Sequence, residues 1–155
     1  MKVLRSWTMA LLGFLMAMSS PGHAEAANLA EEIVWYTNQV RTAYGLVPLQ
    51  VNPALNKAAL WQARTMASHN QMAHVLDGMG PGERLRAVGY PFSTYAENVA
   101  YNLGYENPAR AAMESWIKSP GHFRNILNPE VTEIGVAFAQ GADGAIYYCQ
   151  VFGAR

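Results

Sequence analysis

The order of the hydrophobic patterns along the chain constrains the fold most strongly, because helical spacing comes first and alternation comes last. Apolar residues recur at helical spacing from about Leu29 to Tyr44, and again after the Asn52-Pro53 cap as far as about His69. A third such stretch follows Asn107-Pro108. The end of the chain alternates on both sides of a turn at 141–144, which predicts a hairpin. The chain is therefore expected to be α+β, with helices around a small antiparallel sheet.

Two interruptions of these patterns predict loops. The glycine-rich stretch from Asp77 to Gly82 predicts a loop, followed by a short helix from Glu83 to Val88. Ser119-Pro120-Gly121 breaks the third helix just before His122. His122 is therefore expected at the start of a new turn, where it can face a cleft.

The first residues are typical of a secretory signal peptide. Lys2 and Arg5 precede an apolar run from Trp7 to Met18, which is shorter than the roughly 20 residues of a membrane-spanning helix. Ala24-Glu25-Ala26 matches a cleavage site, and Gly22-His23-Ala24 is a second possible one. We expect a signal peptide over residues 1–26 and one domain over residues 27–155. The product would be exported to the periplasm or the medium, with no transmembrane anchor after cleavage.

Composition indicates a packed globular domain that does not bind nucleic acid. Hydrophobic residues make up 51% of the chain, and 11 Lys and Arg balance 11 Asp and Glu. This balance lacks the basic surplus of a nucleic-acid-binding protein. Cys149 is the only cysteine, so an internal disulfide is excluded and stability must come from packing. Its aromatic neighbours in a strand-like segment predict a buried, slowly reacting thiol.

No common local catalytic signature occurs in the chain. Gly-x-Ser-x-Gly, His-Glu-x-x-His, cysteine-pair and Walker patterns are all missing. After residue 26 the only histidines are His69, His74 and His122, and His69 is interpreted as an ordinary polar residue. Any functional site must therefore join residues that are distant in sequence.

The order of several motifs resembles a known family. They include Asn38-x-x-Arg41, Gly45-Leu46-x-Pro48-Leu49, Ala96-Glu97-Asn98-Val99-Ala100, Trp116-x-x-Ser119-Pro120-Gly121-His122-x-x-Asn125-Ile126-Leu127, and Gln150-Val151-Phe152-Gly153. In sequence and order, the chain from Asn38 to Phe152 resembles the bacterial branch of the CAP superfamily, the SCP domain. The resemblance implies a three-layer α-β-α sandwich.

The resemblance also implies a cleft of two His and two Glu, which holds Zn²⁺ in some members. The matching residues are His74, Glu97 and His122, with Asn98 beside them in the cleft. Of these residues, the resemblance implies His74, Glu97 and His122 as the metal ligands. The fourth family position falls on Ser119, which has no carboxylate. From the residues alone, Glu97 could instead be structural and Asn98 could pin a loop.

Two function classes remain open from the sequence. The first is a secreted binding or interaction module, whose cleft takes a divalent metal, a small apolar ligand, a peptide, a glycan or an extracellular partner protein. The alternative is a metal-dependent hydrolase, a peptidase or esterase, in which Zn²⁺ on the two histidines acidifies a water molecule. Glu97 would then be a ligand or the base. A purely structural role in the cell envelope is a third interpretation.

Overall fold

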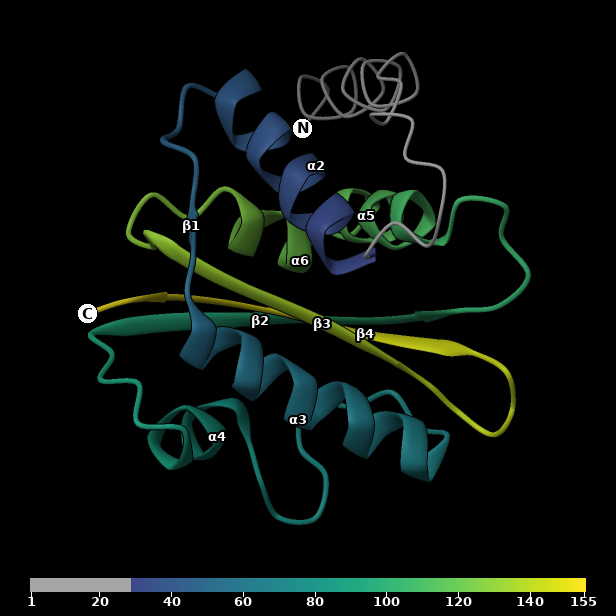
Figure 1. Cartoon of the computed structure of the whole chain (residues 1–155). Coiled ribbons are helices and arrows are strands. Elements are labelled where there is room, and N and C mark those ends of the chain that lie inside the picture. The colour runs from purple at the N-terminus through teal and green to yellow at the C-terminus, as the bar shows by residue number, and fades with distance from the viewer. Residues whose placement is uncertain (1–28) are drawn as a thin grey trace.

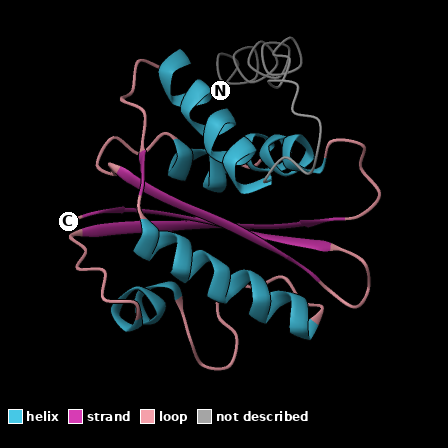
Figure 2. Cartoon of the chain, in the orientation of Figure 1, coloured by secondary structure: helices cyan, strands magenta, loops and turns pink. Residues whose placement is uncertain are grey.

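The computed structural model of the protein describes residues 29–155 and has three layers. The predicted signal peptide lies outside the described residues. Of the five helices in these residues, three cover one face of a central sheet and two cover the other (Figures 1 and 2). In chain order the elements are α2 (Leu29–Ala43), β1 (Gln50–Val51), α3 (Pro53–His69), α4 (Pro81–Ala87), β2 (Thr94–Asn102), α5 (Pro108–Lys118), α6 (Pro120–Ile126), β3 (Glu133–Gln140) and β4 (Ile146–Ala154). The predicted α-β-α sandwich is confirmed.

The sheet has the strand order β1-β3-β4-β2, so β4 lies inside it and β2 forms one edge. β4 pairs antiparallel with both β2 and β3, and β3 with β4 forms the predicted terminal hairpin. The two-residue strand β1 pairs parallel with β3 at the other edge. Neither β1 nor β2 was predicted from the sequence pattern, because β1 is too short to show one and residues 97–100 of β2 are all buried.

Helix starts follow the local capping chemistry. The Asn52 side chain accepts hydrogen bonds from the backbone of Ala54 and Leu55, and Asn107 caps α5 in the same way. Helix α4 begins at Pro81, two residues before the predicted start at Glu83. The reason is that the Glu83 carboxylate accepts from the Gly80 N–H, which extends the helix through the proline at its first position.

Alternation along β4 divides the interior into two apolar cores. Tyr148 and Phe152 pack with α2, α5 and α6, whereas Tyr147, Cys149 and Val151 pack with α3 and α4. Cys149 is fully buried, as predicted. The same alternation along β2 sends neighbouring side chains to opposite faces of the sheet, and this separates Glu97 from Asn98.

Side chains from α5 and α6 cover the outer edge of β2. The Trp116 indole N–H donates to the Val99 carbonyl at 2.9 Å, and the Asn125 amide donates to the Glu97 carbonyl at 3.3 Å. These bonds occupy carbonyls that an edge strand would otherwise leave open. They also fix the start of α6, with His122, beside β2. No helix among residues 29–155 is long and apolar enough to cross a membrane.

Candidate functional site

His74 lies in the loop between α3 and α4 and is held by a buried ion pair. Its Nδ1 atom lies 2.9 Å from Oε1 of Glu97, whose other oxygen, Oε2, accepts from Nη2 of Arg84 at 2.6 Å. The side chains of Arg84 and Glu97 are 1% and 2% exposed, whereas that of His74 is 47% exposed. A charged pair hidden beneath the surface thus supports an accessible imidazole.

His122 lies in the first turn of α6, as predicted from the break at Ser119. Its Nδ1 atom is 2.8 Å from the Ser119 hydroxyl oxygen. The Ser119 side chain makes no hydrogen bond to the backbone of α6, although it occupies the cap position of that helix. Burial lowers the pKa of His122 below its ordinary value, and the charge of a protonated His74 lowers it further. The two imidazoles therefore share one electrostatic environment, with His122 favoured in its neutral form.

Hydrogen bonding defines which ring nitrogen each histidine presents. A carboxylate only accepts hydrogen bonds, so the Nδ1 atom of His74 carries the proton and the neutral ring keeps a lone pair on Nε2. The Ser119 hydroxyl can donate or accept a hydrogen bond, so the contact is compatible with either tautomer of His122. Within the described part of the chain, neither Nε2 atom has a hydrogen-bond partner. Both are available to a ligand.

The residues fit a metal ion only in part. Residues 29–155 contain no group of three or more His, Cys, Asp or Glu side chains placed to hold a metal. The implied set of His74, Glu97 and His122 is not formed as three ligands here, because both oxygens of the Glu97 carboxylate are already bonded. The two imidazole Nε2 atoms remain as candidate ligands, with open positions for water or another group.

Asn98 is buried on the opposite face of the sheet from Glu97. Its amide nitrogen donates to the His122 carbonyl at 3.1 Å and to Oε1 of Gln150 at 3.0 Å, and its oxygen accepts from Asn125. Asn98 thus holds the backbone of His122 and, being fully buried, is not open to a ligand. Strand alternation places it opposite Glu97, since adjacent residues of β2 cannot point the same way.

Sequence reasoning missed Arg84 as a site residue. Its carboxylate partner is 13 residues away, on another element, so no local spacing connects them. The other contact that was missed is the one between Ser119 and His122, which are three residues apart. Their spacing across a helix start was visible, but a serine there is normally a helix cap.

Two hollows lie along α5, beyond the exposed end of β2. One, of about 270 Å³, is lined by Tyr101, Leu103, Tyr105 and small residues of α5, and the other, of about 740 Å³, extends to Lys118. They share Tyr105, Ala111 and Ser115 in their lining and are therefore neighbours. Tyr101 stacks on Tyr147 with ring centroids 5.7 Å apart and remains 58% exposed.

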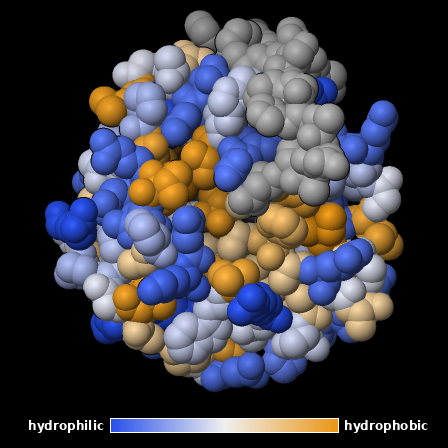
Figure 3. Space-filling model, in the orientation of Figure 1, coloured by the Kyte–Doolittle hydropathy of each residue, from blue (hydrophilic) through white to orange (hydrophobic). Residues whose placement is uncertain are grey.

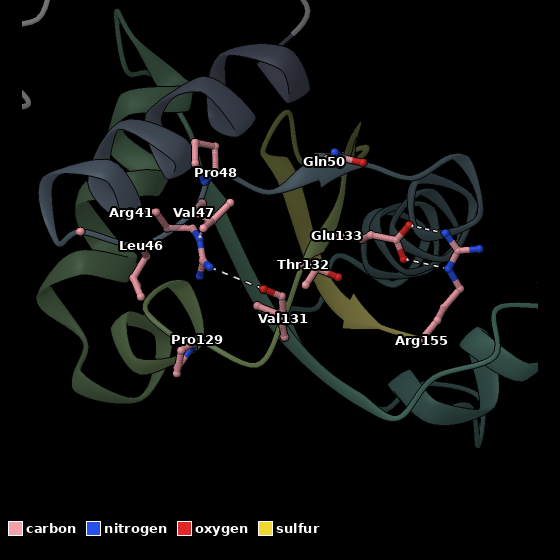
Figure 4. A pocket seen from close by; sticks show the side chains of 11 residues that line it. Arg41, Leu46, Val47, Pro48, Gln50, Pro129, Val131, Thr132, Glu133 and Arg155 are labelled. Atoms are coloured by element: carbon pink, nitrogen blue, oxygen red, sulfur yellow. Dashed lines mark hydrogen bonds and ion pairs between the residues drawn. The ribbon is translucent and has the colours of Figure 1, made fainter.

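A larger hollow, of about 790 Å³, lies at the other edge of the sheet, near β1 (Figure 4). Apolar surface is exposed beside β1 in the space-filling view (Figure 3). The Arg41 guanidinium at this hollow donates to the backbone carbonyls of Val47, Ile126 and Asn128. Arg41 therefore joins separate segments of the chain, and neither histidine lines this hollow.

Comparison with known proteins identifies the family. Residues 34–152 match the model of CAP, the cysteine-rich secretory protein family. The chain belongs to this family, and its motifs resemble the bacterial branch. It is 33% identical over 124 residues to the uncharacterized protein YkwD of Bacillus subtilis, an alignment that covers 79% of this chain and 46% of YkwD. The chain spans less than half the length of the curated relatives it matches.

Solved structures support the same fold. An extracellular SCP-domain protein of Bacillus anthracis is 25% identical with a TM-score of 0.72, over 88% of this chain and 45% of that one. An outer surface protein of Borrelia burgdorferi is 21% identical with a TM-score of 0.73, over 81% of this chain and 91% of that one. NaASP2, determined with Zn²⁺, shares the fold at 12% identity and a TM-score of 0.59, over 87% and 84%.

Proposed function

We propose that the protein is an exported binding module in which the Nε2 atoms of His74 and His122 contact the ligand. The single observation that carries this proposal is that both Nδ1 atoms are occupied by protein groups while both Nε2 atoms remain open. Histidines held in this way resemble ligands supported from behind by hydrogen bonds. The sequence of residues 1–26 and the extracellular and outer-surface names of two structural relatives support export.

The hollows along α5 indicate a ligand class. Their lining includes the exposed side chains of Tyr101, Leu103 and Tyr105, which provide apolar contact area. We propose that a small apolar molecule, a peptide, a glycan or an extracellular partner would contact these hollows as well as the two imidazoles. A divalent cation would occupy the imidazoles alone.

Zinc titration tests the two histidines directly. We expect purified protein to bind Zn²⁺ weakly at neutral pH, because two neutral imidazoles are available but a third protein ligand is not. Affinity should fall as the pH drops below about 6.5, since protons compete for the same nitrogen atoms. His122 should stay neutral to somewhat lower pH than an ordinary histidine, because its pKa is lowered.

The variant His122→Ala should abolish zinc uptake in calorimetry while the protein stays folded. His69→Ala is the matched control, since His69 pairs with Asp77 on the surface and should leave binding unchanged. Absence of zinc uptake by the wild-type protein at neutral pH would contradict the metal part of the proposal, and the histidines would then be groups that contact an organic ligand.

One contact favours the alternative of a hydrolase. The Ser119 hydroxyl lies within hydrogen-bonding distance of His122, the arrangement of a nucleophile or a polarised hydroxyl beside a base. Glu97 is poorly placed to act as a base toward water, because both of its oxygens are bonded. A screen of peptide and ester substrates on the same samples decides: zinc-dependent turnover that is lost in His122→Ala would establish the hydrolase.

A further inference from the structure

Arg84 makes contacts on both sides of the loop that carries His74. Its Nη2 atom donates to Oε2 of Glu97 at 2.6 Å and to the His74 carbonyl at 3.1 Å. Its Nη1 atom donates to the Met79 carbonyl at 2.7 Å. The same buried guanidinium therefore bonds the main chain of His74 and the carboxylate that bonds the His74 ring.

We propose that Arg84 is a positioning residue that sets the tautomer and orientation of His74. By holding Oε2, the guanidinium turns Oε1 of Glu97 toward Nδ1 of His74 and keeps the proton on that nitrogen. By holding the His74 carbonyl, it fixes the backbone from which the ring projects. The Nε2 lone pair of this half-exposed ring is then held in one direction.

The geometry requires an arginine in particular. A guanidinium is planar and rigid, and here it reaches three acceptors on two different segments at once. A lysine ammonium is a compact charge and could compensate the Glu97 carboxylate without keeping both main-chain contacts. Cys149 adds a weaker contact, with its sulfur 3.5 Å from Oε2 of Glu97, but its thiol carries no charge to replace that of the guanidinium.

Loss of the guanidinium has a specific consequence for the His74 ring. The Glu97 carboxylate would keep the hydrogen bond from His74 and the weak contact from Cys149 but no charged partner, so its side chain could rotate. The ring would then sample both tautomers and more than one orientation. A purely structural role of Arg84 would lower stability and leave the tautomer of the folded protein unchanged.

Nitrogen-15 NMR of the histidine rings distinguishes a positioning role of Arg84 from a purely structural one. In metal-free wild-type protein, at a pH where the rings are neutral, we expect His74 to show one tautomer, with the proton on Nδ1. In Arg84→Met the ring signals should move to the averaged position of a mixture, while those of His69 stay unchanged. Arg86→Met is the matched control on the same helix, since Arg86 is exposed and its ion pair is with Glu83 on the surface.

A folded Arg84→Met protein with the wild-type His74 pattern would overturn the proposal. If Arg84→Met does not fold, Arg84→Lys is measured in its place. We expect a mixture of His74 tautomers in this variant, and a wild-type pattern would overturn the proposal in the same way. Zinc affinity provides a second measurement, with a loss of roughly 10- to 100-fold expected on removing a supporting group. This inference extends the proposed function, yet failure of zinc binding in the wild-type protein would leave the NMR result standing.

Discussion

At the scale of single residues, burial determines the reactivity of Cys149. Burial raises the pKa of its thiol well above the ordinary value, and the nearby charge of Glu97 raises it further. Because the thiolate is the reactive form, labelling of the folded protein at neutral pH should be far slower than labelling after denaturation. Paired thiol titrations in native buffer and in denaturant measure the difference. Fast native labelling, or a disulfide-linked dimer in oxidising medium, would contradict it.

The candidate site shows how far residues could be predicted from sequence. His74, Glu97 and His122 were found through family motifs, and the break at Ser119-Pro120 correctly predicted His122 at a helix start. The contacts of these residues could not be predicted from the sequence. Glu97 binds Arg84, which comes from another element, and Asn98 points to the other face of the sheet, which follows from strand alternation.

At the scale of elements, the contact between α3 and β3 depends on a glycine. A Cβ atom added to Gly135 would lie 2.1 Å from the backbone carbon of Leu55 and 2.3 Å from the nitrogen of Asn56. Backbone atoms cannot move aside as a flexible side chain can. We therefore expect Gly135→Ala to lower the free energy of unfolding by at least about 2 kcal/mol, through separation of α3 from the sheet.

Thermal unfolding followed by circular dichroism measures this effect. Gly121→Ala is the matched control, since the nearest heavy atom to an added Cβ is the end of the Arg124 side chain at 4.0 Å. We expect a fall in Tm on the order of 5 °C or more for Gly135→Ala and little change for Gly121→Ala. Equal Tm values for the two variants would show that α3 shifts to accommodate the added methyl group.

Most elements were predictable because their signals are local. Asn52-Pro53 and Asn107-Pro108 start helices through their own side chains, and the terminal alternation produced the hairpin. The two edge strands were not predicted. Residues 97–100 of β2 are all buried, which removes the alternating pattern there, and β1 depends on backbone bonds to the distant segment at 132–134.

At the scale of the whole molecule, two apolar cores on either side of one sheet replace disulfides. The family name refers to cysteine-rich proteins, yet this chain has Cys149 alone, and it lies inside the core beneath α3. Stability should therefore be independent of the redox state of the surroundings. This property suits both compartments proposed for the exported protein.

The proposed export makes a prediction about the mature chain. Cleavage after Ala26 should leave Ala27 as the first residue of the secreted protein, because the preceding segment has the charge and apolar length of a signal peptide. Intact-mass measurement of protein recovered from the medium or periplasm identifies the terminus. Recovery of the chain with Met1 still attached, in a membrane fraction, would rule out cleavage and export in this form.

The position of β4 has a consequence for the timing of folding. This strand pairs with both β2 and β3 and contributes to both cores, yet it comes after all the other helices and strands of residues 29–155. A nascent chain would therefore lack the strand that unites the sheet until residues 146–154 have left the ribosome. Neither core could close before that point, so the elements made earlier would have to wait for β4 before they pack.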